Sequence, residues 1–466
     1  MNRRKPLTIL NYAVNGLGMG HITRLIAINT NIRRLCAIVN KPLVSLFLTT
    51  SEADTLAHRH SFPAYKIPSM TLAEEGKIPQ KLYKTLSRHW VWNAFALWQP
   101  DISVIDTFPA GSFGELPAVL QDSPKNVFVH RAIREEQESK HSFIDAMKLY
   151  DTVIRVQEPY HQVKHTAESE GENNVNVSPI ILEKRETNKT PHQATKHILV
   201  LAGGGGDSNS GLFWEMMLDI SKKIPHRHFI FAIGALHRGS TPHRNNVIWV
   251  NTELNLHHYT ECEFAISAGG FNSVYELLYY GVPTLFYEQT RKFDDQYQRI
   301  IHLEKMGLCR AVNLESIDSL MKAILNMDED HCQQIRSTLS KLTWHNGCQK
   351  AAEAIVSGYV KSDVLDDASS SIQALASFWQ TLSLEEEQLF LDTLYTCASL
   401  MKSAGLDRTI EEKVNSALVF WNNFAQQPTT VTEKRFILKE LIKQPKNKPS
   451  FIDNYSRDFL RILQNI

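Results

Sequence analysis

The chain of 466 residues has no excess of charge and no long apolar run. Fifty Lys and Arg residues balance fifty Asp and Glu residues, so the formal net charge is zero at pH 7. A dedicated nucleic-acid-binding protein usually carries a basic face, and this balance argues against one. No run approaches the roughly 18 apolar residues that a membrane span needs. We therefore expect no transmembrane segment, although peripheral membrane contact stays open.

Cysteine is also scarce and dispersed. The six cysteines include no Cys-x-x-Cys pair that would indicate a zinc or redox site. We expect reduced thiols in a cytoplasmic protein, because the apolar stretch after MNRRKP is interrupted by Asn11 and Asn15 and does not make a secretion signal. The DED string at 328–330 precedes a predicted helix, where acidic residues favour the helix end, so we expect no metal there.

The sequence does contain a repeated alternation of short β-rich runs and helical segments. Runs such as LTILNYAV, PLVSLFLTT, PDISVIDTF and NVFVHRAI, each followed by a helix, are typical of a parallel sheet with crossovers. The polar segment 183–196 has the composition of a linker, and the alternation restarts after it at HILVLAGGGG. We expect two doubly wound α/β domains, at residues 1–182 and 197–360.

A third region begins at about residue 361. Apolar residues recur there at helical spacing, and Gly405 and the stretch QPKNKP supply breaks. We expect residues 361–466 to form an all-α extension that is available for protein contacts or oligomerisation. A separate aromatic run, WVWNAF at 90–95 with Trp98, favours a core helix over a membrane anchor.

The stretch SAGGFNSVYELLYYGVPTLFYEQTRKFDDQY at 267–297 carries the strongest functional signal. A strand leads to Gly269 and Gly270, where a missing side chain lets the backbone approach a ligand. Asn272 or Ser273 can cap the helix that follows. Free N–H groups at such a helix end, together with the helix dipole, make an anion site suited to a diphosphate.

Polar residues further along this stretch add to the signal. Glu276 lies one turn into the helix, where its carboxylate can accept hydrogen bonds from a ribose diol. Asp295 and Gln296 follow the next strand, at an edge of the sheet where sugar hydroxyls can be held. The alternative for any one of them is a surface glutamate or a polar loop, but the ordered set favours a binding site.

A second glycine-rich stretch, NGLGMGHITR at 15–24, follows the first predicted strand. Gly18 and Gly20 do not fit a dinucleotide fingerprint, because their spacing is G-x-G-x-G and no acidic residue ends the second strand. Asp106 ends the strand PDISVID. In a parallel sheet His21 and Asp106 would both emerge at the carboxyl edge.

The motif GGFNSVYELL resembles the donor-site signature of the GT-B nucleotide-sugar glycosyltransferases, and most of all that of family 28. The segments IDTFPAGSFGEL, VHRAIREE and LVLAGGGGD are similar to those of predicted bacterial glycosyltransferases related to the peptidoglycan N-acetylglucosaminyltransferase. The resemblance covers roughly residues 7 to 360. It implies two Rossmann-like domains that face each other across a cleft, and a metal-independent transfer, with inversion, from a UDP-sugar to an unknown acceptor.

The resemblance also implies roles for individual residues. Residues 269–273 would hold the diphosphate, Glu276 the ribose, and Asp295 with Gln296 the transferred sugar. Gly203, Gly204 and Gly205 would line the same cleft, and residues 251–253 would meet the uracil. UDP-GlcNAc is one candidate donor, but Arg299 stands near the place of an asparagine in the peptidoglycan enzyme and leaves the sugar open.

Inverting enzymes of this type often pair a histidine with an aspartate at the positions of His21 and Asp106. A histidine titrates near neutrality and can accept a proton, while a carboxylate fixes its tautomer. His21 can also be a ligand contact or a turn residue, and Asp106 can instead cap the turn before Pro109. Arg24 can pair with phosphate or simply lie on the first turn of its helix.

Two other functions stay open. A UDP-sugar hydrolase of the same fold carries a similar G-x-G-H-x-x-R start, with its histidine activating water. A non-catalytic nucleotide-sugar-binding or scaffold protein would act through the helical tail.

Overall fold

The structure is a computed structural model. It describes residues 5–14, 18–38, 41–131, 133–159, 174–184, 196–203, 208–234, 237, 239–291 and 294–359. Gly204, Gly205 and the predicted helical extension lie outside the described residues, as does most of the predicted linker.

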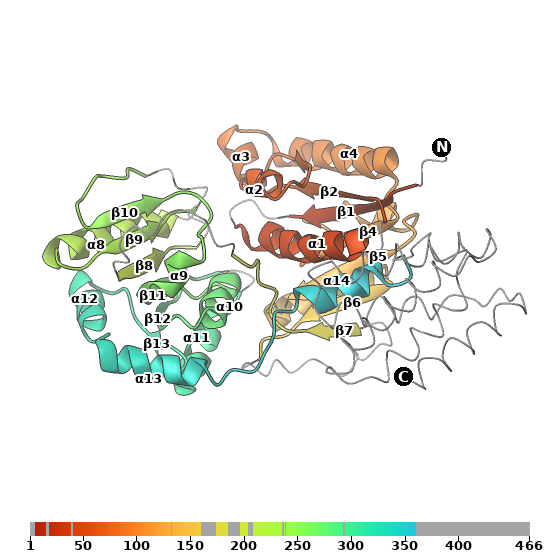
Figure 1. The fold of residues 1–466 in the computed structure, drawn as a ribbon. Coiled ribbons are helices and arrows are strands. Elements are labelled where there is room, and N and C mark those ends of the chain that lie inside the picture. Colours follow the sequence, from red (N-terminus) through yellow and green to blue (C-terminus); the bar gives the residue numbers. More distant parts are fainter. Residues whose placement is uncertain are drawn as a thin grey trace, which may run out of the picture. The chain divides into compact units, whose positions relative to one another are not determined.

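The first sheet, sheet A, is drawn in red to yellow in Figure 1. Its strands among the described residues are Leu7–Ala13 (β1), Leu43–Thr49 (β2), Ala64–Lys66 (β3), Ile102–Asp106 (β4), Asn126–Arg131 (β5), Thr152–Val156 (β6) and Asn174–Val177 (β7). They lie in the order β3-β2-β1-β4-β5-β6-β7. The pairings of β2 with β3, β1 with β4, β4 with β5, β5 with β6 and β6 with β7 are parallel.

The second sheet, sheet B, is drawn in olive to green. Its strands are His197–Leu201 (β8), Phe229–Ala232 (β9), Val247–Val250 (β10), Cys262–Ala268 (β11), Thr284–Tyr287 (β12) and Arg310–Ala311 (β13). They lie in the order β10-β9-β8-β11-β12-β13, and their pairings are also parallel. The prediction of two parallel-sheet, Rossmann-like domains is confirmed.

Helices connect the strands, as the crossovers of a parallel sheet require. They are Gly20–Ile38 (α1), Thr55–Arg59 (α2), Met70–Glu75 (α3), Gln80–Trp98 (α4), Pro117–Leu120 (α5), Glu135–Glu138 (α6), His141–Met147 (α7), Ser208–Lys223 (α8), His257–Thr260 (α9), Phe271–Tyr279 (α10), Gln296–Lys305 (α11), Ile317–Leu325 (α12), Glu329–Leu339 (α13) and Cys348–Val356 (α14). None of the helices in the described part of the chain is long and apolar enough to cross a membrane.

The strand order reverses direction once in each sheet. In sheet A the reversal lies between β1 and β4, and in sheet B between β8 and β11. Ligands of open α/β sheets bind beyond the carboxyl ends of the strands at such a switch point. The loops after these four strands are therefore the places at which the fold builds a site.

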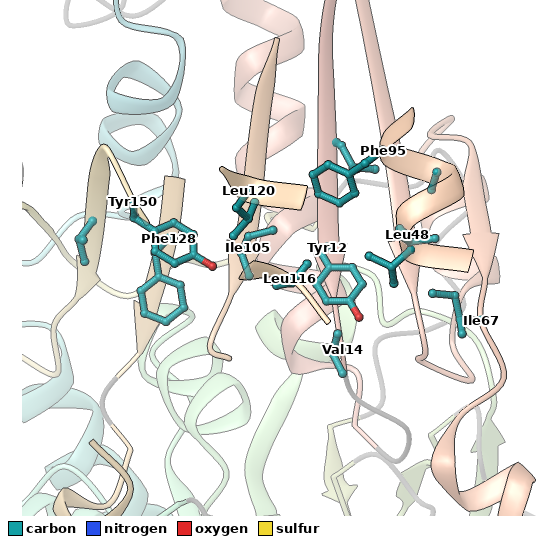
Figure 2. Close-up of a cluster of buried hydrophobic side chains, with 14 residues drawn as sticks. Tyr12, Val14, Leu48, Ile67, Phe95, Ile105, Leu116, Leu120, Phe128 and Tyr150 are labelled. Atoms are coloured by element: carbon teal, nitrogen blue, oxygen red, sulfur yellow. The ribbon is translucent and has the colours of Figure 1, made fainter. Parts of the chain in front are cut away.

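Buried side chains from both faces of the strands hold sheet A together. One cluster, shown in Figure 2, joins Tyr12 of β1 and Val14, which follows this strand, to Phe95 of α4 and Phe128 of β5. Tyr150 packs on Phe128 with ring centroids 5.1 Å apart. This core anchors the ends of β1, β4 and β5, from which the site residues of sheet A emerge.

The chain divides into two compact units. The larger comprises residues 8–29 and 45–351 and contains nearly all of both sheets. Among the described residues, the smaller comprises residues 5–7, 30–38, 41–44 and 352–359, and in it the Leu7 amide donates to the carbonyl of Pro42 at 2.8 Å. The domain boundaries at residues 182 and 197 stay a prediction.

Candidate functional site

A cavity of about 840 Å³ lies in the larger unit. Its wall comes from the segments after β1, β2, β4, β5, β8, β11 and β12 and from α1, α3, α4, α6, α7, α10 and α11. The predicted site residues that line it are Gly18, Gly20, His21, Gly203, Gly270, Asn272, Ser273 and Gln296. The structure thus brings both glycine-rich stretches to one cavity.

His21 and Asp106 form a pair at one side of this cavity. Asp106 is the last residue of β4, as predicted, and His21 is the second residue of α1. The His21 Nδ1 atom lies 3.3 Å from Asp106 Oδ1. His21 lines the cavity, whereas Asp106 is buried beneath it. This arrangement leaves the other ring nitrogen, Nε2, for a ligand.

Arg24 is a further partner of Asp106. Its Nη1 donates to both carboxylate oxygens, at 2.7 and 2.8 Å, and its Nη2 donates to Asn272 Oδ1 at 3.2 Å. The side chain is only 2% exposed. Neither sequence interpretation of Arg24 described this role, because the partner is 82 residues away in the chain.

These contacts set the protonation of the pair. Burial raises the pKa of Asp106, but the charges of Arg24 and His21 outweigh it and hold this pKa below its ordinary value. Burial lowers the pKa of His21, and Asp106 opposes this only in part, since Arg24 and Arg131 lower it further. The geometry therefore favours an ionised Asp106 beside a neutral His21, which is the state of a proton acceptor.

The residue after Asp106 has an unusual backbone. Thr107 has φ +66°, and the Phe108 amide donates to the Asp106 carbonyl at 2.8 Å across it, which closes a three-residue turn. Its hydroxyl donates to Asp106 Oδ1 at 2.5 Å. A β-branched residue in the left-handed region is strained, and such strain gathers at functional sites. Thr107 lines the cavity and was missed in the sequence.

The start of α10 differs from the prediction in one respect. The N-cap is Gly270, and no side-chain hydrogen bond caps this end of α10, so neither Asn272 nor Ser273 is the cap. The helix begins at Phe271, which places these two residues within the first turn. Asn272 instead donates to the carbonyl of Gly20 at 3.1 Å. An N-terminus without a side-chain cap leaves its amides for an anion.

Gly269 has a different reason to be glycine than the one expected. It does not line the cavity, and a Cβ there would lie 2.5 Å from Cδ1 of Ile300 in α11. A larger residue at this position would force the buried Ile300 side chain to move, so close packing of α11 on the end of β11 favours glycine here. A Cβ at Gly270 would meet only Gln296 Nε2, at 3.9 Å, so Gly270 is the position where space for a ligand exists.

Glu276 lies outside the cavity lining. Its Oε1 accepts from the Tyr259 hydroxyl at 2.6 Å and lies 2.8 Å from Lys184 Nζ. In the predicted uracil loop, Glu253 Oε2 lies 3.0 Å from His60 Nε2, and Glu253 Oε1 lies 3.8 Å from Lys184 Nζ. The ribose role of Glu276 stays a prediction, and any diol would share the carboxylate with Lys184.

The side chains of the neighbouring residues Asp295 and Gln296 lie in different surroundings. Gln296 is buried and lines the cavity, and its Oε1 accepts from the Gln289 amide at 3.0 Å. Asp295 is the exposed N-cap of α11, accepts from the Gln298 amide and is not among the lining residues. Its neighbour Asp294 lines the cavity instead. Asp295 therefore caps α11, and its contact with the transferred sugar stays a prediction.

Asp294 belongs to a buried cluster of charges. It accepts from Arg131 Nη1 at 3.0 Å and from Arg299 Nη2 at 2.8 Å. Arg299 also donates to both oxygens of Glu158 at 2.9 Å. Burial raises the pKa of Asp294 and of Glu158, but the arginines outweigh it and lower both below their ordinary values. Arg299 is thus paired with carboxylates and does not line the cavity.

Phe271, the first residue of α10, lies at the centre of these pairs. The guanidinium carbons of Arg24, Arg131 and Arg299 lie 5.7, 5.5 and 5.5 Å from its ring centroid. Each cation therefore also meets the face of an aromatic ring, which is attractive. The sequence offered no signal for this cluster, because the arginines come from three separate segments.

Among the described residues, the charged side chains that line the cavity are mostly basic. Arg24, Arg131, Lys140 and Arg291 face a single acid, Asp294. The second acid of this region, Asp106, is held beneath the wall by Arg24. A surplus of positive charge next to the open end of α10 suits an anionic group such as a diphosphate.

Several solved structures of similar fold are described as glycosyltransferases. The chain is similar to a glycotransferase of kitacinnamycin (TM-score 0.52, 16% identity, 76% of this chain and 99% of that one). It is also similar to the spinosyn rhamnosyltransferase SpnG (0.51, 12%, 75% and 96%) and to the glycosyltransferase SnogD from Streptomyces nogalater (0.51, 14%, 76% and 99%).

Neither a protein-family model nor a curated protein matches the sequence. At these identities the likeness is one of fold. The chain has the GT-B fold of glycosyltransferases, as the sequence motifs predicted.

Proposed function

We propose that this protein is a glycosyltransferase that moves a sugar from a nucleoside diphosphate to a hydroxyl or amine of an acceptor. One observation carries the proposal: His21 and the first turn of α10 line the same cavity. A proton acceptor and an anion site in one cavity are the two elements that transfer from a sugar diphosphate needs. The names of the similar structures, a rhamnosyltransferase among them, support the same reaction class.

The proposed step conserves atoms and charge. The acceptor oxygen or nitrogen attacks the anomeric carbon while His21 Nε2 takes its proton. The bond from that carbon to the phosphate oxygen breaks, and the nucleoside diphosphate leaves with the electron pair. Attack opposite to the leaving group inverts the anomeric configuration. Asp106 stabilises the imidazolium that forms, since Nδ1 lies 3.3 Å from it.

The leaving diphosphate needs positive partners in this cavity. The first N–H groups of α10, Arg131 and Arg291 supply them in our proposal, and no metal ion is needed. We propose UDP as the carrier and Glu276 as the ribose contact. EDTA is expected to leave turnover unchanged, and loss of turnover that Mg²⁺ restores would contradict metal independence.

Nucleotide binding is the first test. We expect UDP or a UDP-sugar to raise the thermal midpoint, because a ligand that binds only the folded state stabilises it. A panel of UDP, dTDP, GDP and ADP, each alone and as a sugar conjugate, identifies the carrier. A midpoint that none of these ligands raises would overturn the proposal.

The His21→Gln variant tests the chemistry. We expect it to bind the donor as the wild type does, since the diphosphate partners are intact. Turnover should fall by a factor on the order of 10²–10⁴, the usual contribution of a general base. The control is His89→Gln, at an exposed histidine of α4. Rapid release of free sugar without an acceptor, measured by chromatography, would identify a hydrolase instead.

A further inference from the structure

The Asp106 carboxylate has two cationic or potentially cationic neighbours that compete for it. Arg24 Nη1 donates to its two oxygens at 2.7 and 2.8 Å, whereas His21 Nδ1 lies 3.3 Å from one of them. The shorter contacts belong to Arg24, whose charge is permanent. Asp106 is therefore primarily the counter-ion of Arg24, and His21 shares its oxygen as a secondary partner.

The position of Arg24 follows from the helix that both residues share. His21 and Arg24 are three residues apart in α1, so they lie on the same face of the helix. Both side chains are withdrawn from water, since that of Arg24 is 2% exposed and that of His21 is 12% exposed. Charge interactions in such a site are much less screened than on the surface.

We propose that Arg24 is a positioning residue that reserves the Asp106 carboxylate and so keeps His21 neutral and ready to accept a proton. The proposal rests on the transferase function argued above. Without Arg24, the charge of Asp106 would act on His21 less opposed and would keep more of the histidine protonated in the resting enzyme, and a protonated histidine cannot accept a proton. With Arg24 present, the carboxylate still fixes the imidazole through Nδ1, but its charge is already balanced.

The charged groups that face His21 agree with this role. They are Asp106 at the end of β4, Arg24 on its own helix and Arg131 at the end of β5, so two cations oppose one anion. Arg131 is itself paired with Asp294, which leaves Arg24 as the cation that shares a partner with His21. Burial acts in the same direction as the two arginines and lowers the pKa of His21.

Arg24 also connects the base to the proposed diphosphate site. Its Nη2 donates to Asn272 Oδ1 at 3.2 Å, and Asn272 Nδ2 donates to the carbonyl of Gly20 at 3.1 Å. Asn272 lies in the first turn of α10. The same guanidinium therefore holds both the carboxylate behind the base and a side chain of the helix that would receive the leaving group.

The test is the titration of His21 in the full chain, followed by NMR of histidine labelled with ¹³C at Cε1. The His21 signal is assigned by its loss in His21→Gln. In the wild type we expect a pKa below the ordinary value of about 6.5. In Arg24→Gln we expect it to rise by about one unit or more, because a nearby cation is lost and Asp106 turns to His21. Arg34→Gln, at an exposed position of the same helix, should titrate as the wild type.

Two further measurements keep the proposal falsifiable if Arg24→Gln does not fold. A wild-type His21 that titrates above about 6.5 would overturn it without any variant. Arg24→Lys keeps the charge and is expected to keep the low pKa; a value as high as that of Arg24→Gln would show that charge is not the cause.

Activity gives an independent readout. The acidic limb of the pH profile of kcat/KM should move to higher pH in Arg24→Gln by the same shift as the titration, and Arg24→Lys should restore it. An unmoved limb would overturn the proposal. The titration needs no substrate, so an absence of turnover in the wild type would contradict the transferase function alone and leave the result on Arg24 standing.

Discussion

Arg299 shows how a residue near a cavity can serve the fold. It donates to both oxygens of Glu158, to Asp294 and to the Gly269 carbonyl, all at 2.8–2.9 Å. Removing one partner of a buried pair leaves uncompensated charge, so Arg299→Met should lower the free energy of unfolding by about 3–5 kcal/mol. Urea unfolding measures this. Lys148→Met, at an exposed pair with Asp145, is the control and should change little.

The same cluster predicts how stability depends on pH. The pKa values of Glu158 and Asp294 are lower in the folded chain than their ordinary values, because the arginines outweigh burial. Their stabilisation is therefore present above the unfolded pKa of about 4 and lost as the pH falls below it. The free energy of unfolding should decline on acidification below about pH 4, and less steeply in Arg299→Met. Equal slopes for both proteins would contradict this.

His21 and Asp106 could be placed from the sequence, because the ends of parallel strands share one edge. The partner of Arg24 could not, since a contact across 82 residues leaves no local pattern. The capping role of Asp295 and the place of Asp294 in the cavity wall were not predicted, although the capping position offered a signal. An aspartate directly before a helix, whose side chain reaches the amide three residues on, has the spacing of an N-cap.

The junction of β11 with α10 gives a matched pair of variants. Gly269→Ala should destabilise the fold by about 1–3 kcal/mol, because its Cβ would clash with Ile300. Gly270→Ala has no such neighbour and a φ of −65°, so stability should change less. Its methyl group would stand at the cavity wall and weaken nucleotide binding. Thermal midpoints with and without UDP separate the two effects, and a reversed pattern would contradict the packing argument.

The longer strands were predictable from their apolar runs, whereas the shortest were not. Strands β3 and β13 contain three and two residues and have no periodicity of their own. They form at sheet edges, where β2 and β12 supply the hydrogen-bond partners. Such strands depend on the neighbouring strand more than on their own sequence.

The aromatic run at 90–95 lies in α4, and the helical periodicity places its side chains on two different faces of the helix. Val91, Ala94 and Phe95 are buried, as a core interpretation predicts, but Trp90 and Trp92 are 46% and 41% exposed. Trp92 is held by a hydrogen bond from its ring nitrogen to the Glu115 carbonyl at 3.0 Å. The run therefore has both a core face and an exposed face, and neither sequence interpretation describes it alone.

The fold class could be predicted from the sequence because both halves repeat the same alternation of short strands and crossover helices. The site was only partly accessible. Motifs at single strand ends were visible, but the cavity joins ends of strands that are far apart in the chain. The three buried arginines and their three carboxylates around Phe271 are a product of tertiary structure, and each partner looks ordinary in its own segment.

A neutral chain with a basic cavity has a testable consequence. The formal net charge is zero, yet four basic side chains and one acid line the cavity in the described part of the chain. Added salt should therefore weaken UDP binding through the phosphates, on the order of tenfold as the Debye length shrinks from about 30 Å to about 3 Å. Uridine lacks phosphate, so its binding should depend little on salt. The Arg291→Gln variant should bind UDP with a weaker salt dependence than the wild type. Titration calorimetry measures all three, and an equal salt dependence for uridine and UDP would show that the basic lining does not hold the phosphates.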